Sequence, residues 1–138
     1  MLVNVKWLEK SAFAARSESN HWIVMDSSYN GGYGAAPTPV EYVLMGLGGC
    51  TGIDVVSILK KMRQEVTDLR MEIEGERAKE HPGVLTRIHV TYRVKGRHLD
   101  PSKVREAIEL SDEEYCSISA MLKKTAQYSY DVEIESGD

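Results

Sequence analysis

A long apolar segment, residues 39–62, limits the folds open to this chain more than any other part of the sequence. Its apolar residues recur at helical spacing and cover almost the whole circumference of a helix: Val40, Val43, Leu44, Leu47, Ile53, Val55, Val56, Ile58, Leu59 and Met62. A helix that is apolar on nearly every side is buried on nearly every side. In a chain of 138 residues a second subunit is the simplest cover, so we expect a homodimer built around a central buried helix.

The two ends of this segment carry helix signals of their own. Thr38 is a typical N-cap residue, and Pro39 suits the first helical position. Lys60 and Lys61 place positive charge at the C-terminal end, where the helix dipole favours it. The most apolar stretch, residues 40–52, is too short to cross a bilayer. Residues 1–7 alternate like a strand and lack a basic end and an apolar block, so we expect no signal peptide. We therefore expect a cytoplasmic protein that does not enter a membrane.

Alternating apolar and polar residues predict strands on both sides of the helix. We expect an antiparallel meander within residues 3–25, a hairpin of residues 69–76 and 88–94, and a last strand over residues 128–134. Two short helices are expected between the hairpin and the last strand. The order β-β-β-α-β-β-α-α-β, with hairpins rather than crossovers, indicates a single α+β domain spanning residues 1–138.

Charge and histidine content exclude several classes of function. The net charge is −4 and the basic residues are scattered, so no nucleic-acid groove is indicated. The four histidines, His21, His81, His89 and His98, have no paired spacing, and with two distant cysteines they form no zinc signature. We expect neither a metal ion nor a cofactor.

Cys50 lies in a glycine-rich stretch, GLGGCTG, at residues 46–52. A thiolate is the reactive form of cysteine, and a free thiol with a pKa of about 8.5 is mostly protonated at neutral pH. A helix that restarts after these glycines would point the amides of residues 51–53 at the sulfur and stabilise the thiolate. The alternative is that Cys50 is a small apolar residue at a tight helix contact.

Cys116 lies at the expected junction between the two short helices. If its sulfur reaches that of Cys50, one thiol can be oxidised by a peroxide to a sulfenic acid and the other can trap it as a disulfide. That reaction requires the two Cα atoms to approach to about 7 Å or less.

A peroxide-reducing thiolate also needs a cation beside it and a carboxylate to orient that cation. Arg16 and Glu41 are the best-placed candidates, although Glu41 also suits a helix start and Arg16 also suits a strand surface. On an unbroken helix Glu41 and Cys50 would face opposite sides, so a shared site requires a break at one of the glycines between them.

Two motifs resemble those of the OsmC/Ohr family. The segments PTPVEYVLMGLGGCT (residues 37–51) and DVVSILKKM (residues 54–62) resemble its central helix, and LSDEEYCSI (residues 110–118) resembles its second cysteine motif. The resemblance implies an OsmC-like fold made as an intertwined homodimer with active sites at the subunit interface. It also implies reduction of peroxides, organic hydroperoxides especially, with Cys50 as the attacking thiol, Cys116 as the resolving thiol and an external dithiol as reductant.

The chain departs from this family at one position. Counted from the proline at the helix start, the family glutamate would fall on Val40, whereas this chain carries Glu41 one residue later. The match of Arg16 to the family arginine is loose. The second hypothesis is therefore a non-catalytic dimeric stress or binding protein that holds a small apolar molecule, with cysteines that sense oxidation or have lost their role.

Overall fold

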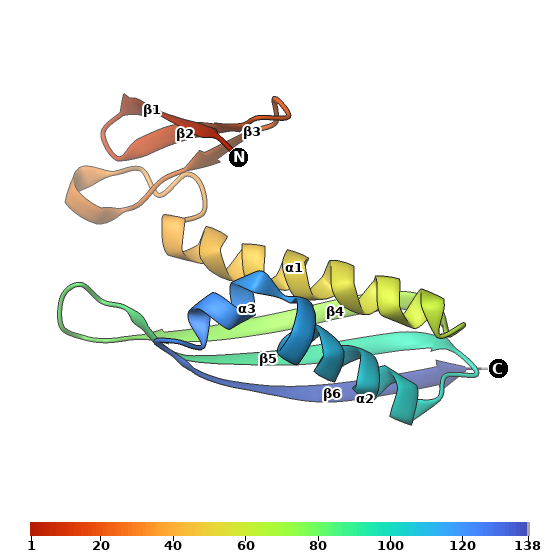
Figure 1. Cartoon of the computed structure of the whole chain (residues 1–138). Coiled ribbons are helices and arrows are strands. Elements are labelled where there is room, and N and C mark those ends of the chain that lie inside the picture. The colour runs from red at the N-terminus through yellow and green to blue at the C-terminus, as the bar shows by residue number, and fades with distance from the viewer. Residues whose placement is uncertain (138) are drawn as a thin grey trace. The chain divides into compact units, whose positions relative to one another are not determined.

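The computed structural model describes residues 1–137, which form two compact units, Met1–Met45 and a second unit that begins at Gly46. The expected order of strands and helices is confirmed (Figure 1). The elements are β1 (Val3–Glu9), β2 (Ala12–Ser17), β3 (Trp22–Met25), a 3-10 turn (Tyr29–Gly31), α1 (Pro39–Lys61), β4 (Glu65–Arg77), β5 (Leu85–Arg97), α2 (Pro101–Leu110), a π-turn (Ser111–Tyr115), α3 (Ser117–Leu122) and β6 (Gln127–Gly137).

The first unit contains the predicted antiparallel meander, with strand order β1-β2-β3. Arg16 of β2 stands opposite Trp22 of β3 in the register. The guanidinium carbon of Arg16 lies 5.9 Å from the centroid of the Trp22 ring, within the range of a cation–π contact. In this unit Arg16 therefore stabilises a cross-strand pair.

A reciprocal pair of hydrogen bonds closes the start of α1. The Thr38 N–H donates to Glu41 Oε1 at 2.9 Å, and the Glu41 N–H donates to Thr38 Oγ1 at 3.3 Å. This arrangement is a capping box, which satisfies two amides that an α-helix leaves without partners. The Tyr42 hydroxyl also donates to the Val24 carbonyl at 2.6 Å, which ties the first turn of α1 to β3.

The second unit is built on a sheet with strand order β4-β5-β6. Strands β4 and β5 form the predicted antiparallel hairpin, but β6 pairs with β5 in parallel. The expectation of hairpins alone is wrong here. Val104, Ala107 and Ile108 give α2 an apolar face that must be buried. The chain therefore crosses the sheet through α2 and α3 before β6 begins, and a parallel pair needs such a crossover.

Alternation along β5 divides the sheet into an apolar and a charged face. Ile88, Val90, Tyr92 and Val94 are buried, and α1, α2 and α3 lie on this side (Figure 1). Two glycines let α1 approach β4 closely. A Cβ atom at Gly48 would lie 2.8 Å from Ile73 Cδ1, and one at Gly52 would lie 2.8 Å from Met71 Cε.

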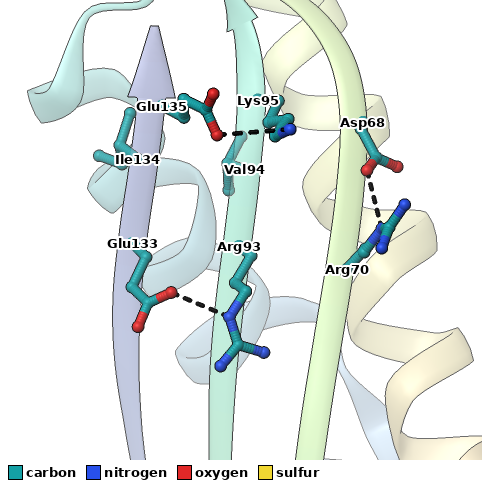
Figure 2. A pocket seen from close by; sticks show the side chains of 8 residues that line it. All are labelled: Asp68, Arg70, Arg93, Val94, Lys95, Glu133, Ile134 and Glu135. Carbon is teal, nitrogen blue, oxygen red and sulfur yellow. Dashed lines mark hydrogen bonds and ion pairs between the residues drawn. The ribbon is translucent and has the colours of Figure 1, made fainter.

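The opposite face of this sheet carries paired charges (Figure 2). Arg93 of β5 bridges Glu133 of β6 at 2.9 Å and Glu72 of β4 at 3.4 Å. Lys95 pairs with Glu135 at 3.4 Å. The basic residues of β5 thus lie on a solvated face that carries both signs of charge.

Helix α1 is longer than the apolar stretch of residues 40–52, which by itself is too short to cross a bilayer. With 23 residues, the helix is long enough and apolar enough to span a membrane, but the core helices of soluble proteins can have the same length and composition. One side of the helix, with Leu47, Val55 and Leu59, is fully buried. On another side Ile53 is 73% exposed, so within one chain the expected burial on most sides is incomplete.

Candidate active site

Cys50 lies within the body of α1. The helix is continuous from Pro39 to Lys61, without a break at Gly46, Gly48 or Gly49. In an unbroken helix the amides of residues 51–53 bond to the carbonyls one turn earlier, so they do not point at the Cys50 sulfur. The prediction that a helix N-terminus stabilises this thiolate is therefore wrong. The Cys50 side chain is half-buried.

Cys116 is held in an irregular turn between α2 and α3. Its N–H donates to the Ser111 carbonyl at 2.8 Å, which closes the π-turn, and its sulfur accepts the Ser119 N–H at 3.4 Å. The Ser119 hydroxyl donates to the Cys116 carbonyl at 3.1 Å. Cys116 is only 3% exposed. Backbone contacts on both sides thus fix the position of this sulfur.

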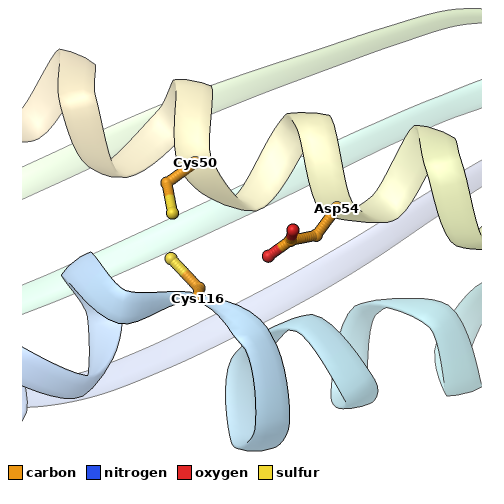
Figure 3. A group of neighbouring side chains, drawn as sticks. All are labelled: Cys50, Asp54 and Cys116. Carbon is orange, nitrogen blue, oxygen red and sulfur yellow. The ribbon is translucent and has the colours of Figure 1, made fainter.

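The structure brings the two cysteines together with a third side chain, Asp54 (Figure 3). The sulfurs of Cys50 and Cys116 and one carboxylate oxygen of Asp54 all lie within 4.8 Å of one another. Both thiols are free. Two sulfurs this close need only a small side-chain movement to reach the bond length of a disulfide, about 2.05 Å.

Asp54 is not among the site residues that the sequence motifs predict. It lies four residues after Cys50 on α1, so the two side chains share one face of the helix. The hydroxyl of the fully buried Ser111 donates to Asp54 Oδ2 at 3.1 Å, which orients the carboxylate. The i, i+4 spacing from Cys50 was the one signal in the sequence that could have identified Asp54.

The surroundings of Cys116 favour its protonated form. Burial is the main cause that raises the pKa of the Cys116 thiol, and a hydrogen bond with the Cys50 sulfur raises it further. The N–H of Ser119 lowers this pKa, but less than burial raises it. Cys116 is therefore a thiol with a proton to donate toward Cys50.

Two tyrosines belong to the same buried region. Burial raises the pKa of Tyr92 and of Tyr128, and interactions with Cys116 and Asp112 act in the same direction. The Tyr92 ring also packs edge-on against Tyr130, with centroids 5.9 Å apart. The two phenols thus stay neutral beside Cys116.

Arg16 and Glu41, the two other predicted site residues, belong to the first unit. Hydrogen bonds from the backbone and side chain of Thr38 lower the pKa of Glu41, so this carboxylate is ionised in its cap. Arg16 packs over Trp22. Both residues have structural roles within this unit, and a role beside Cys50 stays a prediction for each.

Comparison with known proteins agrees with this fold. The family model described as OsmC-like protein matches residues 32–131. The chain is 43% identical to Protein YhfA of Escherichia coli (strain K12) over 134 residues, which cover 97% of this chain and 98% of that protein.

Solved structures show the same fold. The crystal structure of a hypothetical protein from Aquifex aeolicus VF5 is 28% identical, with a TM-score of 0.88 over 99% of this chain and 97% of that one. The organic hydroperoxide resistance protein OhrB of Bacillus subtilis is 19% identical, with a TM-score of 0.65 over 96% of this chain and 98% of that one.

Proposed function

Because this chain belongs to the OsmC-like protein family, we propose that it is a thiol-dependent peroxidase that reduces organic hydroperoxides. The observation that carries the proposal is the contact of two free thiols that are distant in sequence, with sulfurs within 4.8 Å of each other. OhrB, a protein of the same fold, is described as an organic hydroperoxide resistance protein. Reduction of a hydroperoxide by the two thiols would account both for their proximity and for the likeness to OhrB.

The proposed cycle uses both cysteines. The Cys50 thiolate attacks the outer oxygen of the peroxide, the O–O bond breaks, and the departing alkoxide takes a proton to leave as the alcohol. Cys50 is then a sulfenic acid. The Cys116 sulfur attacks the Cys50 sulfur, its proton and the hydroxyl leave as water, and a disulfide forms. An external dithiol returns both cysteines to thiols by exchange.

The burial of the two thiols supports this division of roles. Cys50 is half-buried and can be reached by a small molecule, whereas Cys116 is buried and has Cys50 as its neighbour. Burial raises the pKa of Cys116 and so keeps a proton on the resolving sulfur, and that proton leaves with the hydroxyl of the sulfenic acid as water. Because α1 is unbroken, Glu41 and the Cys50 of the same chain face opposite sides of the helix. In this proposal Arg16 and Glu41 therefore supply the cation and the carboxylate of the complete site across the interface of the homodimer.

The exposed side of α1 supports a homodimer. An open groove between α1 and β4 is lined mainly by glycine and apolar side chains, among them Ile53, Val56, Leu69 and Met71. Ile53 is 73% exposed and Val56 47% exposed, although both belong to an otherwise apolar helix. A second copy of the chain would remove this surface from water. We place the dimer in the cytoplasm, where a dithiol reductant is available.

The decisive experiment follows thiols and peroxide together. Reduced protein is mixed anaerobically with cumene hydroperoxide in a stopped-flow instrument, and thiols are counted after the reaction. We expect the loss of two thiols per chain for each hydroperoxide consumed. Slow oxidation at the rate of a free cysteine, without disulfide formation, would show that the pair is not a peroxidase site.

One observation favours the second candidate function, a dimeric binding or stress protein. Cys50 lies inside an unbroken helix, so the local amides that would stabilise its thiolate are engaged elsewhere. For this second function, the rate of alkylation of Cys50 by iodoacetamide should depend on pH in the folded protein as it does in the urea-unfolded protein. Faster alkylation of the folded protein near neutral pH supports the peroxidase.

A further inference from the structure

We propose that Cys50, Asp54 and Cys116 form a binding site for one zinc ion per chain. The site uses the reduced thiols and does not depend on peroxide reduction. These ligands have no zinc-like spacing in the sequence, which therefore predicts no metal. The fold, however, brings one ligand from the α2–α3 junction against two from adjacent turns of α1 (Figure 3).

The ligand set matches the preferences of zinc. Thiolate sulfur is a strong ligand for Zn²⁺, and a carboxylate oxygen is a common third ligand. In a tetrahedral site with Zn–S bonds of about 2.3 Å and Zn–O bonds of about 2.1 Å, ligand atoms lie about 3.5 to 4 Å apart. The three atoms here lie within 4.8 Å of one another, so an inward movement of about 1 Å completes the geometry. A water molecule can take the fourth position.

Ser111 holds two of the three ligands in place. Its hydroxyl donates to Asp54 Oδ2 at 3.1 Å, which leaves the other oxygen of the carboxylate able to face a metal ion. Its carbonyl accepts the Cys116 N–H at 2.8 Å. Ser111 is fully buried. Groups that orient metal ligands in this way contribute to affinity in known zinc sites.

The carboxylate of Asp112, inside the π-turn, is already paired. Asp112 Oδ1 lies 2.6 Å from Lys123 Nζ, so its charge is balanced within the protein. Among residues 1–137, Asp54 takes part in no ion pair. With two thiolates and one carboxylate, the site carries three negative charges, and binding of Zn²⁺ releases the two thiol protons to solvent.

The first test compares reduced and oxidised wild-type protein. Zinc binding is measured by competition with a chromogenic chelator, and Co²⁺ is used as a second probe because thiolate ligation gives a charge-transfer band in the near ultraviolet. We expect one tight site per chain in the reduced protein. Oxidation with diamide joins the sulfurs, and the site and the band should disappear. Equal zinc binding before and after oxidation would assign the metal to surface groups and overturn the proposal.

Variants then test each ligand. We expect Cys50→Ser, Cys116→Ser and Asp54→Asn each to weaken zinc binding by more than about 100-fold, and Ser111→Ala to weaken it by about 10- to 100-fold. Asn at position 54 can still accept the Ser111 hydrogen bond, so Asp54→Asn changes the ligand without removing that contact. Asp68→Asn, on the charged face of the sheet, is the matched control and should bind zinc like the wild type. Wild-type affinity in Asp54→Asn would overturn the three-ligand site.

Discussion

Cys50 and Cys116 approach each other from segments of different construction. Cys50 stands within a regular helix, where the nearby amides bond to carbonyls one turn earlier, and its side chain is half-buried. Cys116 stands in a π-turn junction that holds it through Ser111 and Ser119, and it is buried. The two thiols are therefore not interchangeable. The thiol on the helix suits reaction with an incoming molecule, and the thiol in the junction suits reaction with its neighbour.

The largest expected effect separates the two thiols by mutation. Cys50→Ser should lower peroxide turnover by more than about 1000-fold, because it removes the proposed nucleophile. Cys116→Ser should keep the first oxidation and accumulate a sulfenic acid, which a dimedone adduct reveals by mass spectrometry. If the adduct forms at Cys116 in the Cys50→Ser variant instead, the assigned roles are reversed.

A smaller difference is expected in the pH dependence of alkylation. Burial raises the pKa of Cys116, so at a given pH less of it is thiolate than in an unfolded chain. Its reaction with iodoacetamide should become fast only at higher pH, and near pH 8 it should be at least about tenfold slower than in the urea-unfolded protein. Peptide mass spectrometry measures each site separately. Equal rates in folded and unfolded protein would contradict a protonated Cys116.

A substitution at Glu41 tests whether this side chain only caps α1 or also takes part in peroxide reduction. Glutamine also fits this position of a capping box, so Glu41→Gln removes the charge and keeps the cap. We expect peroxide reduction to slow by about tenfold or more, because the carboxylate would no longer orient a cation. The free energy of unfolding should change little. Unchanged kinetics would limit Glu41 to its structural role.

The smallest effect is expected at Ser111. Ser111→Ala removes the hydrogen bond to Asp54 and should lower the free energy of unfolding by about 1 kcal/mol in urea titrations. Formation of the disulfide should also slow, because the hydrogen bond that connects the π-turn to Asp54 is lost. Ser28→Ala, at an exposed serine whose side chain makes no cap hydrogen bond, is the control and should leave both quantities unchanged. An effect of equal size at Ser28 would remove the special role of Ser111.

Much of the fold follows from local sequence patterns. Alternation predicts the strands, and Thr38 with Pro39 marks the start of α1 correctly. The same patterns do not show how distant segments pair. The parallel register of β6 depends on where α2 and α3 bury their apolar faces, which is a tertiary effect.

The candidate site is predicted less completely than the fold. The motifs identify Cys50 and Cys116, and the structure brings their sulfurs together. The glycines around Cys50 suggest a helix break, but they serve the close approach of α1 to β4, so the helix continues. Asp54 is absent from the prediction because its significance comes from Ser111, a residue distant in sequence.

The position of the two thiols along the chain links redox state to stability. Strands β4 and β5 and helix α2 all lie between Cys50 and Cys116 in the sequence. A bond between the sulfurs would close these elements into one covalent ring and reduce the conformational freedom of the unfolded chain. For a ring of this length the chain-entropy model gives a stabilisation of about 4 kcal/mol. Oxidation would therefore raise the free energy of unfolding of the second unit, and reduction would lower it again.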